Sequence, residues 1–236
     1  SCMPKLLEYF PAWVVTNLSA KNSLPLVSDL YDLLVIDEAS QCDIASVLPL
    51  LYRARRVVII GDPKQLRHIS ILKEQEDKKL AGKNKIEKLY VDYSYSKNSL
   101  YDLGERIVKS NNQAPILLDE HYRSHEDIIS FSNQYFYDNN LKIKTNPTNF
   151  IESEVTPPGV LWIDVKGKVR YPGNSCYNTE EITEIAHVLK KLKDNNMKNC
   201  SFGVVTFFRE QKERIFDKIN SSKELKEINI SVGTAH

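Results

Sequence analysis

Two short apolar runs, each ending in a group of polar residues, constrain the fold of this chain more than any other feature. Leu33–Ile36 leads into residues 37–41 (Asp-Glu-Ala-Ser-Gln), and Val57–Ile60 leads into residues 61–66 (Gly-Asp-Pro-Lys-Gln-Leu). The first run has no polar alternation, which is typical of a parallel strand covered on both faces. Ligands of open α/β sheets bind beyond the carboxyl ends of such strands. The sequence therefore predicts an α/β fold with its chemistry at these strand ends.

The polar residues after the two runs have the chemistry of a phosphate-bound metal site. Mg²⁺ prefers oxygen ligands and is commonly held by one or two carboxylates together with phosphate and water, so Asp37 is the candidate metal ligand. Glu38 would then be free to orient or deprotonate an attacking water. The amide of Gln65 could accept a hydrogen bond from water and donate one to a phosphate oxygen. An alternative is that Asp37 and Glu38 are an acidic cap for the helix that follows.

The neighbouring segments predict βα units in the first half. Residues 13–16 are predicted to form a strand and residues 17–20 a polar turn, where Thr16 and Ser19 could contact a phosphate backbone; a solvated turn is the alternative. Helical spacing of apolar residues (Ile44, Val47, Leu48 and Leu51) predicts a helix closed by the basic residues 53–56. Residues 67–98 are Lys-rich and weakly periodic, so we interpret them as a surface excursion with a helical piece.

The second half continues the alternation of strands and helices. Ser99 is predicted to cap a helix, and residues 178–181 to cap a longer one with an apolar face (Ile182, Ile185, Ala186, Leu189 and Leu192). Residues 116–118, 160–164 and 202–206 are predicted strands, and residues 156–159 a turn.

Composition sets broad limits on the class of protein. With 236 residues, 42% hydrophobic and 27% charged, the chain is globular and has room for one large domain or two ordinary ones. A net charge of +1 gives no overall basic field, so any nucleic-acid contact must come from local placement. The apolar runs are too short to cross a bilayer and the start lacks a signal-peptide pattern, which leads us to expect a cytoplasmic protein. The four cysteines form no CxxC pair, so reduced thiols are expected rather than a zinc site.

Taken together, residues 37–41 and 61–66 resemble motifs II and III of the superfamily 1 helicases. Gln41 and the Gly-Asp-x-x-Gln-Leu form are similar to the branch that contains the nonsense-mediated-decay RNA helicase. Residues 119–125 (Asp-Glu-His-Tyr-Arg-Ser-His) resemble the family's motif IV, and residues 230–236 resemble the start of motif V. Residues 206–211 resemble a turn that usually reads Thr-Pro-Tyr-x-x-Gln, with two phenylalanines in place of Pro and Tyr.

The resemblance implies an α/β fragment of two incomplete RecA-like domains with parallel sheets flanked by helices. Residues 1–118 would be the C-terminal part of the first domain, with an insertion at about 67–98, and residues 119–236 the N-terminal part of the second. The implied activity is that of an ATP-dependent helicase, with ATP and Mg²⁺ as cofactors, that moves from 5′ to 3′ on single-stranded DNA or RNA.

The resemblance also assigns site residues. Asp37, Glu38 and Gln65 would form one wall of an ATP site between the domains. Tyr122 would stack on the adenine and Arg123 would reach the γ-phosphate, which suits an aromatic face and a fixed guanidinium. The hydroxyls at turns suited to nucleic-acid phosphates are those of Thr16, Ser19, Thr206 and Thr234.

A phosphate loop of the form Gly-x-x-x-x-Gly-Lys-Ser/Thr does not occur in the sequence, and neither does the arginine of motif VI. We therefore expect this segment by itself to show no meaningful ATP turnover. Two alternatives stay open. One is an ATP-driven switch on nucleic acid without unwinding, and the other is a degenerate, non-enzymatic nucleic-acid-binding module.

Overall fold

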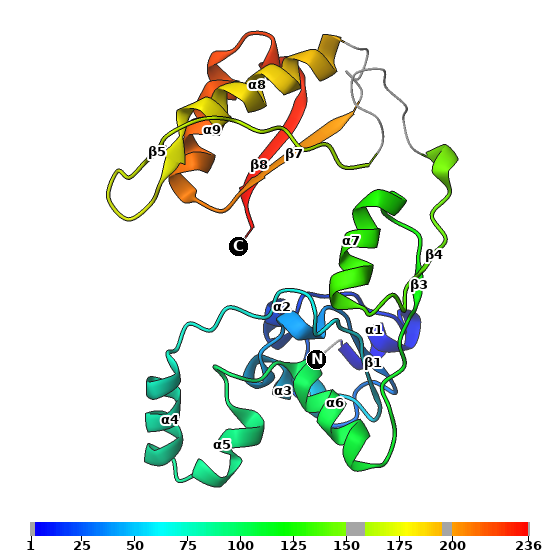
Figure 1. The fold of residues 1–236 in the computed structure, drawn as a ribbon. Coiled ribbons are helices and arrows are strands. Elements are labelled where there is room, and N and C mark those ends of the chain that lie inside the picture. The colour runs from blue at the N-terminus through cyan, green and yellow to red at the C-terminus, as the bar shows by residue number, and fades with distance from the viewer. Residues whose placement is uncertain (1–2, 150–158, 195–199, 236) are drawn as a thin grey trace. The chain divides into compact units, whose positions relative to one another are not determined.

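The protein consists of two compact units, Ser1–Leu118 and Asp119–His236 (Figure 1). The structure is a computed structural model, and it describes residues 3–149, 159–194 and 200–235. In each unit, strands that are separated along the chain by a helix pair in parallel, which is the pattern of an α/β fold. The predicted fold class is confirmed.

The first unit contains these elements in chain order: α1 (Met3–Tyr9), α2 (Asn17–Ser23), β1 (Leu34–Ile36), the short 3-10 helix η1 (Ala39–Gln41), α3 (Ile44–Tyr52), β2 (Val57–Ile59), α4 (Glu74–Lys83), α5 (Glu87–Tyr93) and α6 (Leu100–Ser110). Both predicted strands around the first two motifs are therefore present, as are the helix between them and the helix after Ser99. Ser99 caps α6 as expected, since its hydroxyl accepts a hydrogen bond from the Asp102 amide at 3.2 Å.

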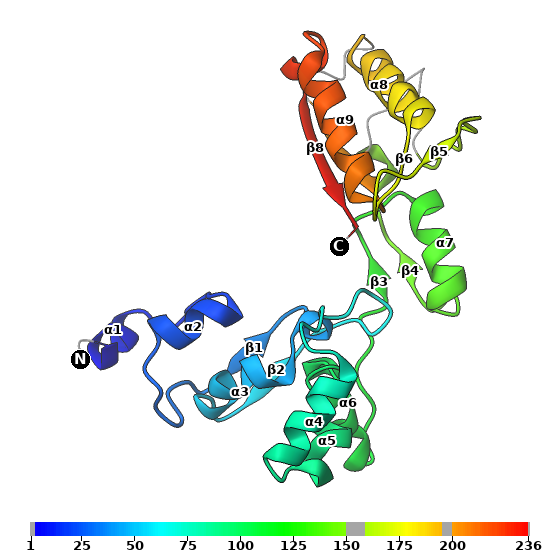
Figure 2. The same ribbon diagram turned by 90° about the vertical axis from the view of Figure 1, so that its left-hand side faces the viewer.

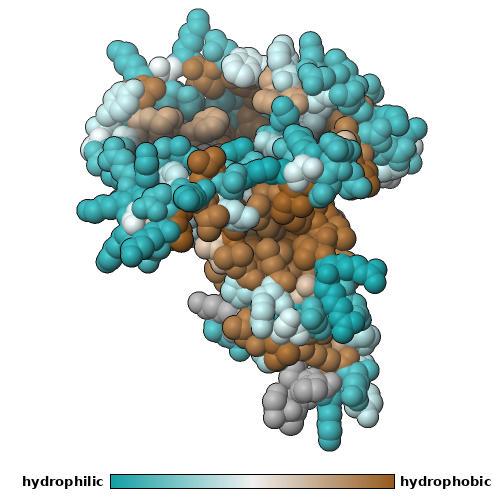
Figure 3. Space-filling view, turned by 90° about the horizontal axis from the view of Figure 1, so that it is seen from below, coloured by the Kyte–Doolittle hydropathy of each residue, from teal (hydrophilic) through white to brown (hydrophobic). Residues whose placement is uncertain are grey.

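Strands β1 and β2 run parallel, with Leu34 opposite Val57 and Ile36 opposite Ile59. One face of this pair packs on helices, in a core built from α2, β1, η1, α3 and α6. The buried members of that core are Ala20, Leu24, Ile36, Ala39, Val47, Leu50 and Leu100. The opposite face is open, and the side chain of Val35 is 54% exposed. The expectation of a strand covered on both faces is thus wrong for the described residues, because the helices pack on the side of Ile36. Figure 3 shows apolar side chains gathered in continuous areas on the face in view.

Several local predictions for the first unit are wrong. Residues 13–16 form no strand, and residues 17–20, predicted as a turn, begin helix α2, for which Thr16 is the N-cap. Residues 116–118 also form no strand. The prediction that the segment from Arg53 closes α3 is confirmed, since Arg53 is the C-cap of that helix. Its guanidinium is buried and donates to the carbonyls of Leu24, Pro25 and Pro49 at 2.6 to 2.8 Å. Arg53 therefore ties the end of α3 to the segment before β1.

The second unit contains these elements in chain order: β3 (Glu120–His121), α7 (Glu126–Phe136), β4 (Lys142–Ile143), the 3-10 helix η2 (Pro147–Asn149), β5 (Val169–Arg170), β6 (Tyr177–Asn178), α8 (Thr179–Asp194), β7 (Ser201–Thr206), α9 (Arg209–Ser221), the 3-10 helix η4 (Leu225–Glu227) and β8 (Asn229–Thr234). Strands β7 and β8 pair in parallel along their whole length, from Ser201 opposite Asn229 to Thr206 opposite Thr234. Helices α8 and α9 lie beside each other on this pair (Figure 2).

The core of the second unit lies between these two helices and the inner face of β7 and β8. Its buried apolar side chains are Ile182, Ala186, Leu189, Ile215, Ile219, Leu225 and Ile228. The predicted cap of α8 is confirmed, since the side-chain oxygen Oδ1 of Asn178 accepts hydrogen bonds from the amides of Glu180 and Glu181. Gln211 of α9 joins this cap, because its side chain accepts from the Asn178 amide at 2.8 Å and donates to Glu181 at 3.0 Å.

Two further predictions concern the segment before α8. Residues 160–164 form no strand, and the Trp162 side chain is 87% exposed. The predicted turn at 156–159 lies outside the described residues except for Gly159. In the parts of the chain that are described, Cys42, Cys176 and Cys200 are free thiols. None of the helices described is both long enough and apolar enough to cross a membrane.

Candidate nucleotide site

The parallel pairing of β1 and β2 brings the two motifs together at one edge of the sheet. The hydrogen-bond ladder continues past the strands, since the Ile60 amide donates to the Ile36 carbonyl and the Ala39 amide donates to the Ile60 carbonyl, both at 2.8 Å. The His68 amide then donates to the Ser40 carbonyl at 3.3 Å. Residues 37–41 and 61–68 are therefore held against each other by main-chain bonds.

Gly61 is where the two loops approach most closely. A Cβ atom at this position would lie 3.0 Å from the Ser40 amide nitrogen and 3.0 Å from Cδ2 of Tyr101, with the Ala39 amide nitrogen at 3.3 Å. With a larger residue at this position, one of these neighbours would have to move by a few tenths of an ångström. Burial raises the pKa of Tyr101, as do the carboxylates of Glu105 and Asp62, so this ring stays neutral against the loops.

Glu38 has an unusual backbone conformation at the end of β1. Its φ of 52° lies in the left-handed region, which side chains other than Asn, Asp and Gly rarely adopt. The residue precedes η1, but its side chain makes no capping hydrogen bond there. The next helix, α3, is capped instead by Asp43, whose carboxylate accepts from the Ser46 amide at 2.8 Å. The carboxylate of Glu38 is thus exposed and accepts a bond from Gln41 Nε2 at 3.2 Å.

Asp37 lies beside Glu38 and is also exposed. One of its carboxylate oxygens accepts a hydrogen bond from the Glu38 amide at 2.9 Å, which fixes the carboxylate at the strand end. Mg²⁺ that is bound with a nucleotide commonly takes one or two carboxylates and fills its remaining positions with phosphate and water oxygens. The exposed Asp37 carboxylate fits that donor set. No group of three or more His, Cys, Asp or Glu side chains gathers as a metal site within the described ranges.

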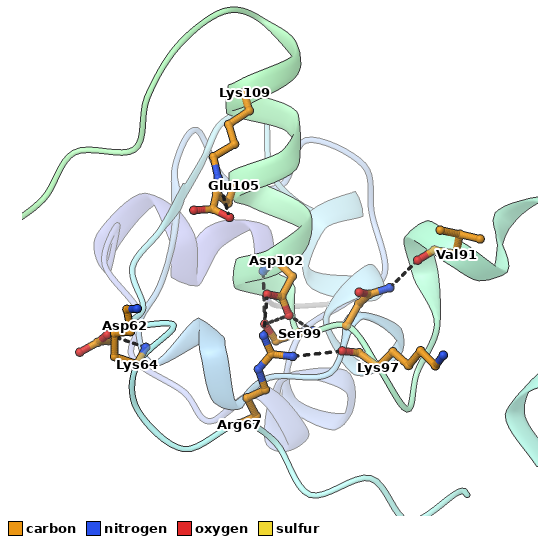
Figure 4. A network of polar contacts seen from close by, with 10 residues as sticks. Asp62, Lys64, Arg67, Val91, Lys97, Ser99, Asp102, Glu105 and Lys109 are labelled. Atoms are coloured by element: carbon orange, nitrogen blue, oxygen red, sulfur yellow. Dashed lines mark hydrogen bonds and ion pairs between the residues drawn. The ribbon is translucent and has the colours of Figure 1, made fainter. Parts of the chain in front are cut away.

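Gln65 is held within its own loop. Its side-chain Nε2 donates to Asp62 Oδ2 at 2.9 Å. The other carboxylate oxygen of Asp62 accepts from the Lys64 amide at 2.9 Å (Figure 4). Asp62 was not among the site residues predicted from the sequence. Its position after Gly61 and before a proline is the signal for such a turn, because a short acidic side chain commonly accepts from an amide two residues on.

Two other residues at this edge were also not predicted. The Ser40 hydroxyl is buried and has no hydrogen-bond partner among the described residues, so a polar group is held inside the motif. The Cys42 thiol lies 3.7 Å from the Glu38 carbonyl, and burial, followed by the nearby carboxylates of Asp43 and Glu38, raises its pKa. Cys42 therefore stays a neutral thiol below the loop at ordinary pH.

Tyr122 and Arg123 lie in the second unit, in the turn after β3. The turn is fixed on both sides, since His121 belongs to the β3–β4 pair and its ring Nε2 accepts from the Ser124 amide at 2.8 Å. The Tyr122 ring is 63% exposed and its hydroxyl donates to the Glu120 carboxylate, which raises the pKa of Tyr122. The Arg123 side chain is exposed. Both side chains are thus presented on a short, anchored turn.

The four predicted hydroxyl contacts fall into two pairs. Thr206 and Thr234 are direct neighbours at the carboxyl ends of β7 and β8, and the Ala235 amide donates to the Thr206 carbonyl at 3.2 Å. Thr16 and Ser19 belong to the first turn of α2, where their hydroxyls lie 3.0 Å apart and the Ser19 amide donates to the Thr16 hydroxyl. The first pair is at a sheet edge, whereas the second serves as a helix cap.

Comparison with known proteins adds to this geometry. A family model described as an AAA domain matches residues 99–236, and a second model with the same description matches residues 14–71. The chain is 29% identical over 224 residues to an uncharacterized ATP-dependent helicase of Mycoplasma genitalium, a match that covers 92% of this chain and 18% of that protein. It is 30% identical over 198 residues to the probable helicase senataxin of Homo sapiens, covering 78% of this chain and 7% of that protein.

A fission yeast protein gives a match of the same kind. The chain is 29% identical over 191 residues to helicase sen1 of Schizosaccharomyces pombe, covering 77% of this chain and 10% of that protein. The chain thus spans less than a fifth of the length of these relatives.

Proposed function

This chain belongs to the AAA-domain family of superfamily 1 helicases, and from that premise we propose that it forms part of an ATP-dependent motor that moves along single-stranded DNA or RNA. In this proposal the two compact units are the two RecA-like domains, and residues 67–98 are an insertion in the first. Movement from 5′ to 3′ and a cytoplasmic location are expectations that rest on the sequence alone.

The observation that carries the proposal is the state of the Glu38 carboxylate. It stands exposed at the carboxyl end of a parallel strand, where α/β proteins bind their ligands, and it is not used as a helix cap. Within hydrogen-bond reach of a water, a carboxylate in this place orients the water and accepts its proton. Asp37 would hold Mg²⁺, whose charge neutralises phosphate oxygens in phosphoryl transfer.

Gln65 is proposed to report the state of the phosphates. Its amide is held by Asp62 in this structure, and the same Nε2 group has the chemistry to donate to a phosphate oxygen. Exchange between these two acceptors would move the loop after β2. That loop is bonded to the loop after β1 through main-chain groups, so a change at one would be felt by the other.

The second unit would supply the remaining contacts to ATP. The exposed Tyr122 ring offers a planar face for the adenine base. Arg123 offers a guanidinium that can hold two phosphoryl oxygens as negative charge develops on them. The nucleic-acid strand would run across the edge where Thr206 and Thr234 meet, since hydroxyls and amides at such positions contact phosphates without reading sequence. Thr16 and Ser19 are proposed as contacts in the first unit.

The test is ATP hydrolysis by the longer protein that contains this segment, measured with single-stranded nucleic acid present. Replacing Glu38 with Gln should lower the maximal rate by roughly 10²- to 10⁴-fold, because the amide cannot accept the proton. Equilibrium binding of ATP should change little, because the side chain keeps its size and place. Glu8→Gln is the matched control, since Glu8 is an exposed glutamate on α1, and it should hydrolyse ATP like the wild type.

Hydrolysis by Glu38→Gln at the wild-type rate would refute the assignment of Glu38. Strand displacement measured with the same wild-type protein separates the motor from its alternative. ATP turnover that depends on the strand but never separates a duplex would identify an ATP-driven switch instead.

A further inference from the structure

The helical piece predicted within residues 67–98 is a hairpin of two helices, α4 and α5, over residues 74–93. Helix α4 carries Glu74, Glu76 and Asp77 in its first turn, where negative charge is stabilised by the helix dipole. The turn to α5 is tight: the Ile86 amide donates to the Ala81 carbonyl at 3.0 Å, and Lys85 takes a φ of 58°. The hairpin therefore has a defined shape.

A buried carboxylate locks the hairpin closed. One oxygen of Asp77 accepts hydrogen bonds from the Ser94 hydroxyl at 2.7 Å, the Ser96 hydroxyl at 2.9 Å and the Ser96 amide at 3.0 Å. Burial alone would raise the pKa of Asp77, but the bonds from Ser96 and Ser94 outweigh it and lower the pKa below its usual value. Asp77 therefore stays ionised and joins α4 to the segment after α5.

The outer side of the hairpin carries unbalanced positive charge. Five exposed lysines form no ion pair with any described residue: Lys78, Lys79, Lys83, Lys85 and Lys88. Three nearby acidic groups are used elsewhere, because Glu74 pairs with Lys97 at 2.6 Å, Asp92 pairs with Arg106, and Glu76 accepts from the Lys73 amide. The exposed Glu87 offsets only one of the five positive charges.

The spacing of the lysines places them away from the core. Asp77 and Ala81 are buried and lie four residues apart, which defines the inner side of α4. Lys79 and Lys83 also lie four residues apart, two positions further on, so they occupy the opposite side. Like charges at this spacing destabilise a helix by a few tenths of a kcal/mol. Lys83 is favoured by the helix dipole in the last turn of α4, but Lys79 is not, so the repulsion between the two favours an anionic ligand as the reason for their placement.

The hairpin is anchored to the nucleotide edge of the sheet. His68 donates its amide to the Ser40 carbonyl, and its ring Nε2 donates to the Tyr95 carbonyl at 2.8 Å. Arg67 donates to the Lys97 carbonyl and to the Asp102 carboxylate, both at 3.4 Å (Figure 4). Arg67 and His68 follow directly after the loop of Gln65. His68 thus connects residues 37–41 to the segment after α5, and Arg67 connects helix α6 to the same segment.

We propose that the α4–α5 hairpin is a second binding surface for the phosphate backbone of single-stranded nucleic acid, with Lys79, Lys83 and Lys88 as its contacts. The choice of ligand rests on the proposed function, because an acidic protein would also suit a cluster of lysines. A phosphate backbone is the better match, since the lysines are spread as separate point charges over both helices and the turn between them. The contact would be coupled to the nucleotide edge through Arg67 and His68.

The test is the salt dependence of strand binding by this chain, without nucleotide. On a single strand, each phosphate that a lysine neutralises contributes about 0.7 to the slope of log affinity against log salt. The triple variant Lys79→Gln, Lys83→Gln and Lys88→Gln should therefore lower the slope by about 2, and affinity should fall at every salt concentration. The arginine versions of the same three substitutions should restore binding, which separates removal of charge from damage to the fold.

The matched control removes the same charge elsewhere. Lys218, Lys223 and Lys226 are exposed lysines of the second unit, at the end of α9 and in the segment that follows. Their triple replacement by glutamine should change the slope by less than about 0.5, since these lysines would neutralise no phosphate. An equal effect of both triple variants would overturn the proposal, because it would mean that only net charge matters.

Two further outcomes would also overturn it. Competition by polyglutamate as strong as by a nucleic-acid strand of the same charge would identify an acidic protein as the natural ligand. If the triple glutamine variant of the hairpin binds single strands as tightly as the wild type, all contacts to the strand lie elsewhere. Failure of the proposed function would be seen separately, as a longer protein that binds single strands through the hairpin lysines but does not hydrolyse ATP.

Discussion

Replacing Gly61 with alanine should push the two loops at the nucleotide edge apart. The added Cβ would lie 3.0 Å from the Ser40 amide nitrogen and 3.0 Å from the Tyr101 ring. A main-chain nitrogen cannot rotate out of the way as the end of a long side chain can. Adding a carbon to a tightly packed place costs about 1–3 kcal/mol. We expect the weakening to fall on the 2.8 Å bond from the Ala39 amide to the Ile60 carbonyl.

Hydrogen–deuterium exchange reports the destabilisation of the first unit separately from the second. A melting curve would combine the unfolding of both units. A cost of about 1–3 kcal/mol corresponds to roughly 5- to 150-fold faster exchange of the amides that open with these loops. Peptides covering residues 33–42 and 57–66 should show that increase. Peptides from the second unit should exchange as in the wild type.

The control for this change is Gly203→Ala in β7. An added Cβ at Gly203 would meet no heavy atom within 4 Å. The same chemical change should therefore not destabilise β7, because alanine in place of a strand glycine favours the folded state by roughly 0.5–1 kcal/mol. Equal exchange in Gly61→Ala and the wild type would refute the close approach of the two loops, and with it the geometry of the proposed site.

Further expectations follow from other contacts. In the longer protein, Arg123→Lys should slow hydrolysis by roughly 10³-fold or more with little change in ATP binding, because lysine loses the planar fork; unchanged steady-state rates would make Arg123 a structural residue. Tyr122→Ala should instead raise the Michaelis constant more than it lowers the maximal rate, since stacking acts equally on bound ATP and the transition state. Because the pKa of Asp77 in the folded protein lies below its usual value of 3.8, ionised Asp77 stabilises the hairpin above pH 3.8. This stabilisation should be lost as the pH falls from 3.8 through the lowered pKa of the folded protein. Amide exchange at residues 94–98 should therefore accelerate below about pH 3.8, unlike in Asp77→Asn, where the step should be absent.

The strands that could be predicted from sequence are those with a neighbour. The runs at Leu34–Ile36, Val57–Ile59 and Ser201–Thr206 all pair in parallel with another strand. The runs at 13–16, 116–118 and 160–164 are equally apolar but form no strand, and their side chains include some of the most exposed in the chain. A strand needs a partner for its main-chain bonds, and a short apolar run does not reveal whether that partner exists.

The site could be predicted in part for a related reason. An apolar run followed by carboxylates predicted that Asp37 and Glu38 lie at a strand end. The structure places the loop of residues 61–68 directly beside them. The side-chain partners could not be predicted, because they depend on which loop atoms come within hydrogen-bond reach. The sequence shows that the Gln65 amide can bond water and phosphate, but it does not show that Asp62 of the same turn accepts its hydrogen bond. Within residues 67–98 a helical piece was predicted, but the closure of the hairpin was not, since the bonds to Asp77 join residues 17 to 19 positions apart.

Backbone conformation offers an independent argument for where function lies. Six residues other than glycine in the described ranges have positive φ, and four of them are Asp or Asn, which tolerate this region well. The other two are Glu38 and Lys85. Neither side chain suits the conformation, so each is retained at a cost that a glycine or asparagine would avoid. At Lys85 the conformation serves the fold, because the Lys85 amide donates to the Gly82 carbonyl and the Ile86 amide donates to the Ala81 carbonyl, which are the bonds that end helix α4. Glu38 is not at such a helix end, since it lies between β1 and η1. Its strained backbone is therefore the one that points to function, at the proposed catalytic edge.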